Sequence, residues 1–422
     1  MDNLTHSVVG LGLGALVDRS LADEADPGRQ RVRTRMLLVI GCLASNFPDL
    51  DLVLGRLLEA PLGYLLYHRG HTHTLLGALG ELVLLLAGIW LLWPAARRLL
   101  RASAPARGAA LFTAVAGLLL HIAMDSLNVY GVHPFWPFDP DWYYGDLVFI
   151  VEPVFWIGFG IPLASMVERK PLRWLLFAAM AAVPLGVTLA GFLQWGSLAG
   201  LLVLGVVLAL IQRHSRHRPR GARSRAALAA GLAVSLAFVG VQAAALRQAR
   251  AIVDANLRSL DPAEQLLDTA LSAYPANPLC WSFVSVERSG GGKDGGADAS
   301  FQLRRGLLSI APGLDPVQSC PAALAGRAGA GASAQLAWQS DERESVAALR
   351  TLRQTNCHVD AWLRFARAPA LAPGAGIATD ARWGPPGSLN FSSLWYKELA
   401  PLPCPHPVPG WAYPRADLLG LH

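Results

Sequence analysis

Eight apolar segments fill most of the first 246 residues of this chain. Several of them approach the ~20 residues that a helix needs to cross the hydrocarbon core of a bilayer. Hydrophobic residues make up 53% of the chain, charged residues only 16%, and the mean hydropathy is +0.35, so the chain is more apolar than a soluble globular protein. We therefore predict a mostly α-helical, polytopic transmembrane bundle of about eight helices, with seven passes as the main alternative, because the first segment is short enough to be re-entrant or interfacial. The segments cover 4–17, 36–47 running on to about 55, 74–93, 109–127, 147–167, 173–192, 196–212 and 226–246.

Arginine and lysine gather in every second loop between these segments, at 18–35, 94–108, 168–173 and 212–225. Short cytoplasmic loops of membrane proteins carry such a positive excess. With eight passes, the pattern predicts a protein of the bacterial inner membrane whose N-terminus and C-terminal region lie on the periplasmic side. The same loops account for most of the net charge of +6, so we expect membrane lipids as partners and no nucleic acid.

The composition changes after residue 246, which divides the chain into a transmembrane part, 1–246, and a C-terminal part, 247–422. Leucines at near-helical spacing and β-rich runs beside turn residues predict a small α+β extracytoplasmic domain there. The expected elements are a helix over 247–272, strands over 279–287 and 301–310 around a glycine-rich turn at 289–297, a small-residue stretch at 321–334, a helix near 341–355 and an irregular tail over 368–414.

Four of the five cysteines fall in this C-terminal part: Cys280, Cys320, Cys357 and Cys404. An even set in a domain outside the cytoplasm predicts two disulfides, with three possible connectivities. Metal binding by these thiols is disfavoured because the sequence has no C-x-x-C pair.

Histidine and aspartate stand at the ends of several apolar segments, and in the predicted topology all of them lie on the outer side. Ionisable groups near hydrocarbon are costly unless they are paired, hydrated or bound to a cation. Imidazole and carboxylate together suit zinc or a related divalent ion. The sequence therefore predicts a site for one or more divalent ions, with zinc as the expected metal. Its expected ligands are His6, Asp49, His68, His73, His121 and Asp125.

Spacing adds detail to this hypothesis. The pair His121-x-x-x-Asp125 places two ligands on one helix face, one turn apart. Asp49 and Asp51 project to opposite sides of an extended chain, so one is expected to bind metal while the other orients a histidine. Three or four protein ligands with an open position would let a bound water attack an ester.

Asp51, Arg69 and Glu152 are the residues to which we assign catalytic roles. Arg69 is placed to hold a phosphate or carboxylate oxygen through two hydrogen bonds. Glu152 and Asp2 are expected as further ligands, bases or orienting groups.

Other polar residues have simpler interpretations. His71 is expected to face solvent, and His133 to belong to an interfacial aromatic belt. Asp146 is the expected N-cap of the fifth helix. Taken singly, each proposed ligand also has such an interpretation, as a packed histidine or a helix cap.

These motifs together resemble the YdjM-like family of membrane-bound, metal-dependent hydrolases. The resemblance covers about residues 1–167, and Thr74 stands where the family pattern has serine. Glu152 resembles the family's acidic residue before a proline. The resemblance implies a remote similarity to zinc-dependent phospholipase C, and hence phosphodiester hydrolysis that includes lipid substrates. The motifs are Asp2-x-x-Thr5-His6, Pro48-Asp49-x-Asp51, His68-Arg69-Gly70-x-Thr72-His73 and His121-x-x-x-Asp125 followed by Asn128-x-Tyr130-Gly131.

The leading hypothesis is a metal-dependent hydrolase that acts at the periplasmic face on a phosphate or other ester of a lipid or envelope substrate. One alternative is a non-enzymatic metal or proton carrier, which needs polar groups deeper in the membrane. The interiors of the third, sixth, seventh and eighth segments offer almost none beyond Glu81, Thr188 and Gln242. Another alternative is a degenerate enzyme that anchors a periplasmic binding module.

Overall fold

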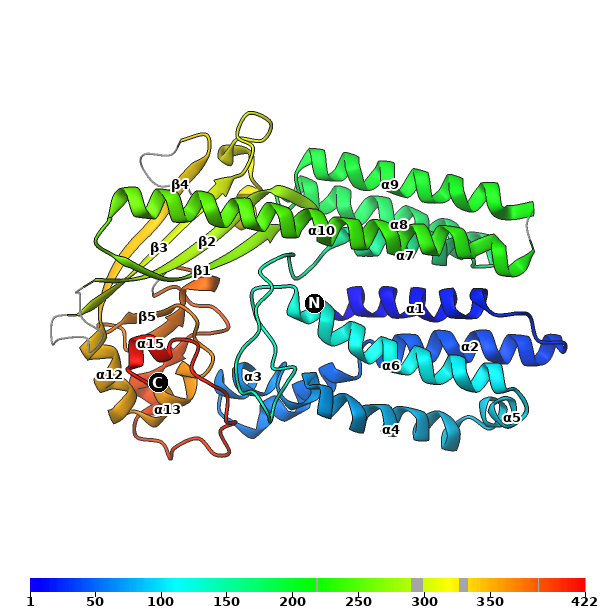
Figure 1. Ribbon diagram of the computed structural model, residues 1–422, viewed down its shortest axis with the longest axis horizontal. Helices are drawn as coiled ribbons and strands as arrows, with labels where there is room; N and C mark the ends of the chain where they lie inside the picture. The colour runs from blue at the N-terminus through cyan, green and yellow to red at the C-terminus, as the bar shows by residue number, and fades with distance from the viewer. Residues whose placement is uncertain (218, 290–298, 326–332, 386, 422) are drawn as a thin grey trace.

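The computed structural model describes residues 1–217, 219–289, 299–325, 333–385 and 387–421. Figure 1 shows long helices side by side at one end of the molecule and a mixed domain at the other. Eight helices coincide with the eight predicted apolar segments. They are α1 (Asn3–Ser20), α2 (Pro27–Ala44), α4 (Leu75–Leu92), α6 (Ala104–Ser126), α7 (Pro153–Ser165), α8 (Lys170–Leu189), α9 (Trp195–His214) and α10 (Arg220–Leu260).

The predicted polytopic helical bundle is confirmed. Within the described residues, six stretches are long and apolar enough to cross a membrane, and they include α2, α4, α6, α8, α9 and most of α10. The helix α7 has 13 residues and is shorter than a full span, while α1 is not among the six. Both are packed inside the bundle, where α7 lies between α1, α9 and α10.

Side-chain caps fix where the helices begin. Asp2 accepts a hydrogen bond from the backbone N–H of Thr5 at the start of α1, and Thr74 accepts one from Gly77 at the start of α4. The N-cap of α7 is Glu152, not Asp146 as predicted, because the chain becomes helical only at Pro153. A proline at the first position suits this start, since its missing N–H has no partner inside the helix.

The helices α1 and α2 approach each other so closely that glycine is required. A Cβ atom on Gly14 would lie 2.2 Å from the carbonyl oxygen of Leu37, and one on Gly10 would lie 2.3 Å from that of Gly41. This contact holds the N-terminal turn of α1, which carries His6, beside the end of α2.

Short elements connect the helices at the end that faces the C-terminal domain. They are η1 (Pro48–Leu57), α3 (Leu62–Tyr67) and η2 (His71–His73), whereas α5 (Pro94–Ala102) lies at the opposite end. The second apolar segment, predicted to run on to about 55, lies within the candidate membrane span Pro27–Leu57, in which α2 ends at Ala44 and the 3₁₀-helix η1 follows.

The C-terminal part contains two antiparallel sheets and several short helices. The larger sheet has the order β1-β2-β3-β4, with β1 (Gln265–Tyr274), β2 (Asn277–Ser289), β3 (Ser300–Ser309) and β4 (Leu336–Ser345). The smaller sheet is formed by β5 (Pro369–Ala372), β6 (Ile377–Asp380) and β7 (Leu394–Trp395). The helical elements of this part are η4 (Val317–Ser319), α11 (Ala322–Ala325), α12 (Val346–Thr355), α13 (Cys357–Leu363), η5 (Ala381–Trp383), α14 (Tyr396–Leu399) and α15 (Ala416–Leu419). The short element η3 (Ser215–His217) belongs to the membrane part, between α9 and α10.

The predicted strands 279–287 and 301–310 are confirmed as β2 and β3, which pair as an antiparallel hairpin. The predicted helix over 247–272 is wrong after residue 260, because 265–274 form β1 on the edge of the sheet. The helix expected at 341–355 starts at Val346, since 341–345 complete β4. Most of the predicted turn 289–297 and the middle of the stretch 321–334 lie outside the described residues.

The end of α10 ties the membrane part to the larger sheet. Its residues Ala249, Val253 and Leu257 pack against Trp281 and Leu308 on one face of the sheet. The other face packs against the C-terminal helices and the smaller sheet. Both predicted disulfides are present, and the structure selects the connectivity Cys280–Cys320 and Cys357–Cys404.

Candidate metal centre

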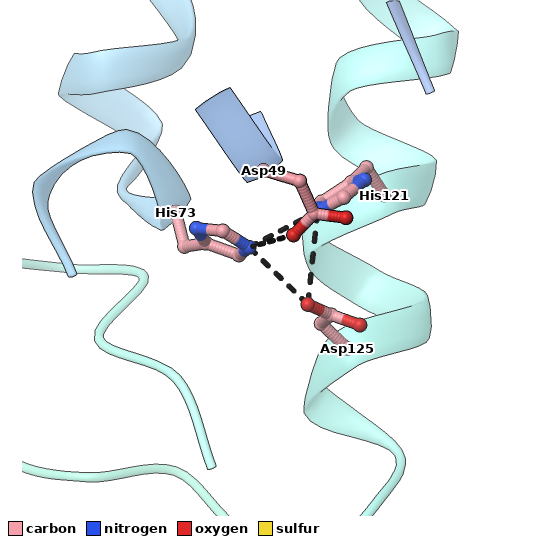
Figure 2. Close-up of side chains that lie close together, drawn as sticks. All are labelled: Asp49, His73, His121 and Asp125. Atoms are coloured by element: carbon pink, nitrogen blue, oxygen red, sulfur yellow. Dashed lines mark hydrogen bonds and ion pairs between the residues drawn. The ribbon is translucent and has the colours of Figure 1, made fainter. Parts of the chain in front are cut away.

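Four buried side chains converge where η1, η2 and α6 meet at the end of the bundle. Asp49, His73, His121 and Asp125 each offer one nitrogen or oxygen atom, and these atoms all lie within 4.8 Å of one another. Figure 2 shows the four side chains pointing toward a common centre. Residues from three separate elements thus form one compact cluster.

The two histidines present the same ring nitrogen to this centre. The Nε2 atoms of His73 and His121 are 3.0 Å apart. His73 Nε2 lies 3.2 Å from Asp125 Oδ2 and 3.6 Å from Asp49 Oδ1. His121 Nε2 lies 3.6 Å and 3.7 Å from the same two oxygens.

Hydrogen bonds on the far side of each ring determine which nitrogen carries the proton. His121 Nδ1 lies 2.8 Å from the carbonyl oxygen of Ser45, which can only accept, so Nδ1 is the donor. His73 Nδ1 faces the Asp51 carboxylate at 3.2 Å and is the donor there. In the neutral rings, both Nε2 atoms therefore present lone pairs to each other and to two carboxylates.

The nearby cations of the chain, the guanidinium of Arg69 and the amino group of Met1, contact Asp125, whereas Asp49 has no such partner among the described residues. Asp49 Oδ1 is buried and accepts no hydrogen bond from the described residues. Lone pairs and carboxylate oxygens that face one another repel unless a proton or a metal ion lies between them. Two imidazole nitrogens and two carboxylate oxygens are a donor set that fits a divalent ion such as zinc.

His121 and Asp125 lie on one face of α6, as their spacing of four residues predicts. The expectation for Asp49 and Asp51 needs correction, because the 3₁₀-helix η1 turns both carboxylates to the same side. Asp51 nevertheless has the orienting geometry expected of one of the pair, because it contacts both His73 Nδ1 and His68 Nδ1, the latter at 3.1 Å.

A second group of potential ligands shares Asp49 with the first and adds Asp51 and His68. The side chain of His68 is 11% exposed, more than any of the residues in the first group. Burial lowers the pKa of the His68 imidazole, which favours the neutral ring. The cluster therefore extends from a closed interior toward a partly open edge at His68.

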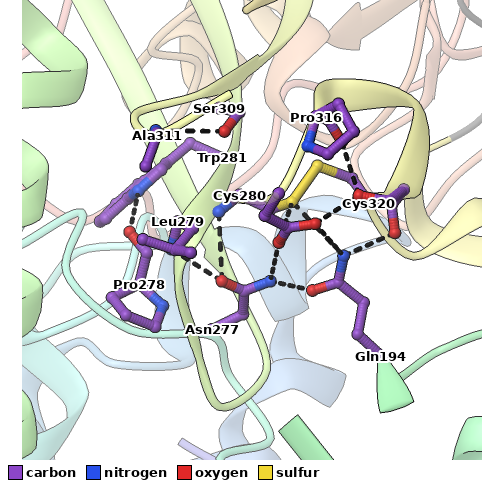
Figure 3. The surroundings of a disulfide bond; sticks show 12 residues. Gln194, Asn277, Pro278, Leu279, Cys280, Trp281, Ser309, Ala311, Pro316 and Cys320 are labelled. Carbon is purple, nitrogen blue, oxygen red and sulfur yellow. Dashed lines mark hydrogen bonds between the residues drawn. A yellow bond between two sulfur atoms is a disulfide. The ribbon is translucent and has the colours of Figure 1, made fainter. Parts of the chain in front are cut away.

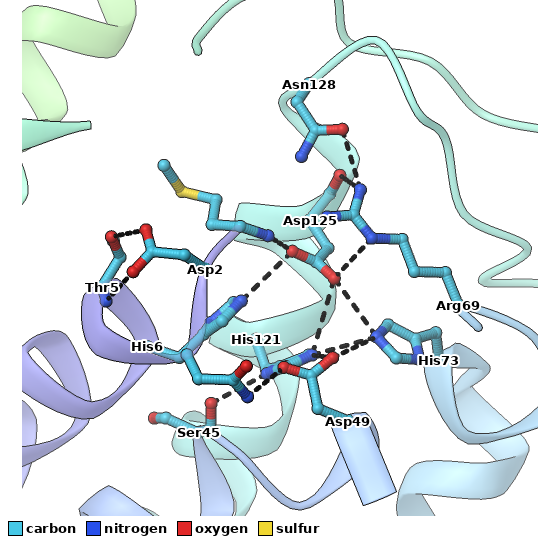
Figure 4. Close-up of polar contacts among 12 residues, drawn as sticks. Asp2, Thr5, His6, Ser45, Asp49, Arg69, His73, His121, Asp125 and Asn128 are labelled. Atoms are coloured by element: carbon cyan, nitrogen blue, oxygen red, sulfur yellow. Dashed lines mark hydrogen bonds and ion pairs between the residues drawn. The ribbon is translucent and has the colours of Figure 1, made fainter. Parts of the chain in front are cut away.

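His6 and Arg69 surround the carboxylate of Asp125 (Figure 4). His6 Nε2 lies 3.2 Å from Asp125 Oδ1, and its ring stacks on that of His121 with centroids 3.9 Å apart. Arg69 Nε lies 3.0 Å from Asp125 Oδ2. The amino group of Met1 also contacts Asp125 Oδ1. The predicted ligand His6 thus contacts a member of the group of four without belonging to that group.

Three residues that had no assigned role support the cluster. Asn128 Oδ1 accepts a hydrogen bond of 2.8 Å from Arg69, and the guanidinium of Arg69 lies 4.8 Å from the ring centroid of Tyr130. The carbonyl of Ser45 orients His121. Asn128 and Tyr130 stand in the motif after Asp125, so the sequence contained a signal for them, whereas a backbone carbonyl leaves none.

Glu152 and Asp2 have other partners in the structure. The Glu152 carboxylate accepts hydrogen bonds from the backbone N–H groups of Val154 and Ala276, both at 3.1 Å. Burial raises the pKa of Glu152 to about 8. Asp2 caps α1 and also contacts the Thr5 hydroxyl. These contacts give both residues structural tasks outside the group of four.

Two further histidines differ from their expected surroundings. His71 does not simply face solvent, because its ring packs against Trp136 and Trp411 at 4.6 Å and 4.9 Å. His133 is fully buried between Trp142 and Trp411 rather than part of a lipid-facing belt. Burial lowers the pKa of His133 to about 3. The C-terminal tail, through Trp411, covers both rings.

The fold and the cluster together define a polytopic helical membrane protein with a buried His/Asp group able to hold a metal ion. Residues 1–195 match the family model described as YdjM inner membrane protein, so the resemblance to that family is confirmed for this part of the chain.

One curated relative is the uncharacterized protein YfhP of Bacillus subtilis strain 168. It is 29% identical over 158 residues, which cover 37% of this chain and 44% of YfhP. The chain thus spans less than half of this relative. No solved structure matches the chain. The remote similarity to zinc-dependent phospholipase C stays a prediction.

Proposed function

We propose that this protein is a membrane-embedded, metal-dependent hydrolase with its centre at Asp49, His73, His121 and Asp125. The observation that carries the proposal is the convergence of these side chains, with two Nε2 lone pairs facing two carboxylates at the end of apolar helices. Buried charge of this kind in a membrane protein is more often functional than structural.

The chemistry follows from the ligands and their neighbours. A divalent ion bound here supplies Lewis acidity and brings the pKa of water toward neutrality. Asp51 holds His73 in the tautomer that binds metal, and the Ser45 carbonyl does the same for His121. His68 lies at the more open edge and is the proposed residue for moving a proton. Arg69 is already engaged with Asp125 and Asn128, so we assign it the task of orienting Asp125.

Apolar side chains beside the centre support a lipid or other amphiphilic ester as substrate. The 3₁₀-helix η1 buries Asp49 and Asp51 but leaves Leu50, Val53 and Leu57 more than half exposed. The membrane-spanning stretch Pro27–Leu57 continues through these residues. An ester group at the membrane surface would therefore meet the centre without leaving the lipid phase. The positive-inside pattern supports a periplasmic location of this end.

The test combines metal analysis with a screen of phosphate and carboxylate esters. Purified protein is expected to contain stoichiometric metal and to hydrolyse at least one ester class. His121→Gln and Asp125→Asn each remove one ligand of nearly the same size, so they are expected to lose both the metal and the activity. His214→Ala, an exposed histidine at the opposite end of the bundle, is the matched control and should retain both.

Stoichiometric metal in the double variant of His121 and Asp125 would reject the centre. Metal that disappears in the variants, without any ester hydrolysis in the original protein, would reject the hydrolase and leave a metal-binding protein.

A carrier of metal ions or protons is the second candidate, because α4 holds one acidic group within its span. Glu81 is 7% exposed, and its Oε2 atom has no hydrogen-bond partner among the described residues. Uptake of zinc or protons by proteoliposomes separates the two functions. Transport that is lost in Glu81→Gln would favour the carrier, whereas ester hydrolysis that is unchanged in Glu81→Gln would favour the enzyme.

A further inference from the structure

A large groove lies away from the candidate metal centre, between α9, α10 and the C-terminal domain. Its volume is about 1110 Å³, and its walls on α9 and α10 are apolar, formed by residues such as Leu201, Leu204, Val234 and Phe238. Its rim nearest the C-terminal domain is polar and belongs to the loop before α9 and to that domain. The groove thus has an apolar part and a polar part, like a membrane lipid.

The depth of the groove corresponds to one leaflet of a bilayer. On α9 the lining runs from Trp195 to Leu204, which at 1.5 Å per residue is ~14 Å. The hydrocarbon core of a bilayer is ~30 Å thick, so half of it is ~15 Å. Both lining helices are candidate membrane spans. The apolar walls therefore extend as far as an acyl chain in the leaflet nearest the C-terminal domain.

Exposed apolar side chains stand at the mouth of the groove. Trp195 is 63% exposed, Val241 52% and Leu314 83%, and all three belong to the lining. Leu314 lies in the C-terminal domain, outside the helices that span the membrane. Because it lines the same groove as Trp195, the C-terminal domain extends to the region where aromatic residues gather at a membrane surface.

The polar rim is built from a connected set of side chains beside the Cys280–Cys320 disulfide (Figure 3). Asp315 accepts hydrogen bonds from Gln194 Nε2 at 3.1 Å and Asn277 Nδ2 at 3.2 Å, and Gln194 also bonds to the backbone of Ser319. The described lining residues include this one carboxylate and no lysine or arginine. The rim is therefore negative, which favours an ammonium headgroup and disfavours an anionic one.

We propose that this groove binds one zwitterionic phospholipid of the ethanolamine type. Its acyl chains lie against α9 and α10, and its ammonium group lies at the rim formed by Gln194, Asn277 and Asp315. The site is separate from the candidate metal centre, and the proposal does not depend on the proposed hydrolase activity.

The test is native mass spectrometry of the full chain after reconstitution with equal amounts of phosphatidylethanolamine and phosphatidylglycerol and release into mild detergent. The original protein is expected to retain phosphatidylethanolamine. Gly200→Trp is expected to lose it, because Gly200 lines the groove and a Cβ there meets no atom within 4 Å, so the indole can fill the space. Asp315→Asn should retain lipid but lose the preference for ethanolamine.

Gly240→Trp is the matched control. Gly240 is also an exposed helical glycine without a neighbour within 4 Å of its Cβ, but it does not line the groove. It should retain the lipid. Unchanged retention in Gly200→Trp, equal losses in both glycine variants, or a preference for phosphatidylglycerol would each overturn the proposal.

Discussion

Two buried clusters of charge in this protein differ in how their carboxylates are compensated. In the first, Arg367 lies between Asp146 and Asp268 and makes two hydrogen bonds to each carboxylate, at 2.7–3.1 Å. Arg250 and Arg415 lie 3.4 Å and 3.6 Å from the same two carboxylates. In the second, the candidate metal centre, Asp125 is paired with Arg69 at 3.0 Å, whereas Asp49 faces the Nε2 atoms of His73 and His121 and has no arginine partner among the described residues. Both carboxylates of the first cluster therefore contact arginine, and in the second the carboxylate of Asp49 does not.

The comparison indicates what each cluster does. A buried carboxylate needs a cation or several hydrogen-bond donors to offset its lost hydration. The Arg367 cluster has this compensation within the chain, and it joins the loop before α7 to the sheet of the C-terminal domain. At the candidate centre Arg69 compensates Asp125, and Asp49 would gain comparable compensation from a bound metal ion.

Glu152 represents a third case, in which the described residues place no cation beside a buried carboxyl group. Its hydrogen bonds come from backbone N–H groups, and burial raises its pKa to about 8. In contrast, the pKa of the partly buried Asp268 is about 2, because burial, which raises it, is outweighed by the attraction and hydrogen bonds of Arg367 and by the attraction of Arg415. Guanidinium groups beside a carboxyl group thus favour its charged form.

The largest effect is expected from removing the guanidinium of the first cluster. Arg367→Met leaves the buried Asp146 and the partly buried Asp268 with only the longer contacts to Arg250 and Arg415, which should cost about 3 kcal/mol of unfolding free energy, the lower end for a broken buried pair. The free energy of unfolding is measured by denaturation, with limited proteolysis used to follow the unfolding of the C-terminal domain. Arg343→Met is the control, since Arg343 is 55% exposed and forms an ion pair with one carboxylate, that of Glu264, so its loss is expected to cost less. Equal effects of the two substitutions would break the comparison.

Metal removal tests the second cluster. If the centre needs a cation, a chelator should lower the unfolding temperature, and added zinc should restore it. A metal at a hundredfold excess over its dissociation constant stabilises a protein by about 2.7 kcal/mol. Asp49→Asn should be insensitive to both additions. A chelator effect that persists undiminished in Asp49→Asn would place the bound metal elsewhere.

For a change of one pH unit, the smallest effect is expected from the pH dependence that Glu152 contributes. Its pKa is near 4.5 when unfolded and about 8 when folded, so between these values only the folded state keeps the proton. Stability should therefore fall as pH rises from about 4.5 to 8, by at most about 1.4 kcal/mol per pH unit. Glu152→Gln should remove this slope, while Glu168→Gln, an exposed glutamate, should keep it. Identical slopes in both variants would contradict the assignment.

Apolar segments of membrane length were the most predictable part of the fold. All eight predicted segments became helices, because a run of that length and hydropathy buries its backbone polar groups only as a helix. The error at 261–272 arose because Leu266, Leu267 and Leu271 fit both helical spacing and a half-buried strand. Pairing with β2, across the chain, made this stretch a strand.

Most of the residues that the sequence predicted as metal ligands lie close together in the structure. Asp49, His73, His121 and Asp125 do converge, and His6 and His68 lie beside them. The orientation of Asp49 and Asp51 was predicted wrongly, because the four-residue motif at 48–51 is compatible with both an extended segment and a 3₁₀-helix. Glu152 was grouped with the centre by its motif, whereas the structure gives it the task of capping α7.

The amino-acid sequence determined that this chain forms a helical membrane bundle with a polar cluster at one end. It did so through its composition, its repeated apolar segments and the position of its ionisable residues. The tertiary structure alone decided which carboxylates contact arginine, as Asp146 and Asp125 do, and which face only imidazole and amide groups, as Asp49 does. The physical reason is that burial and pairing depend on distances of a few ångströms between residues far apart in the chain. Arg367 and Asp146 are separated by 221 positions, and no local pattern relates them.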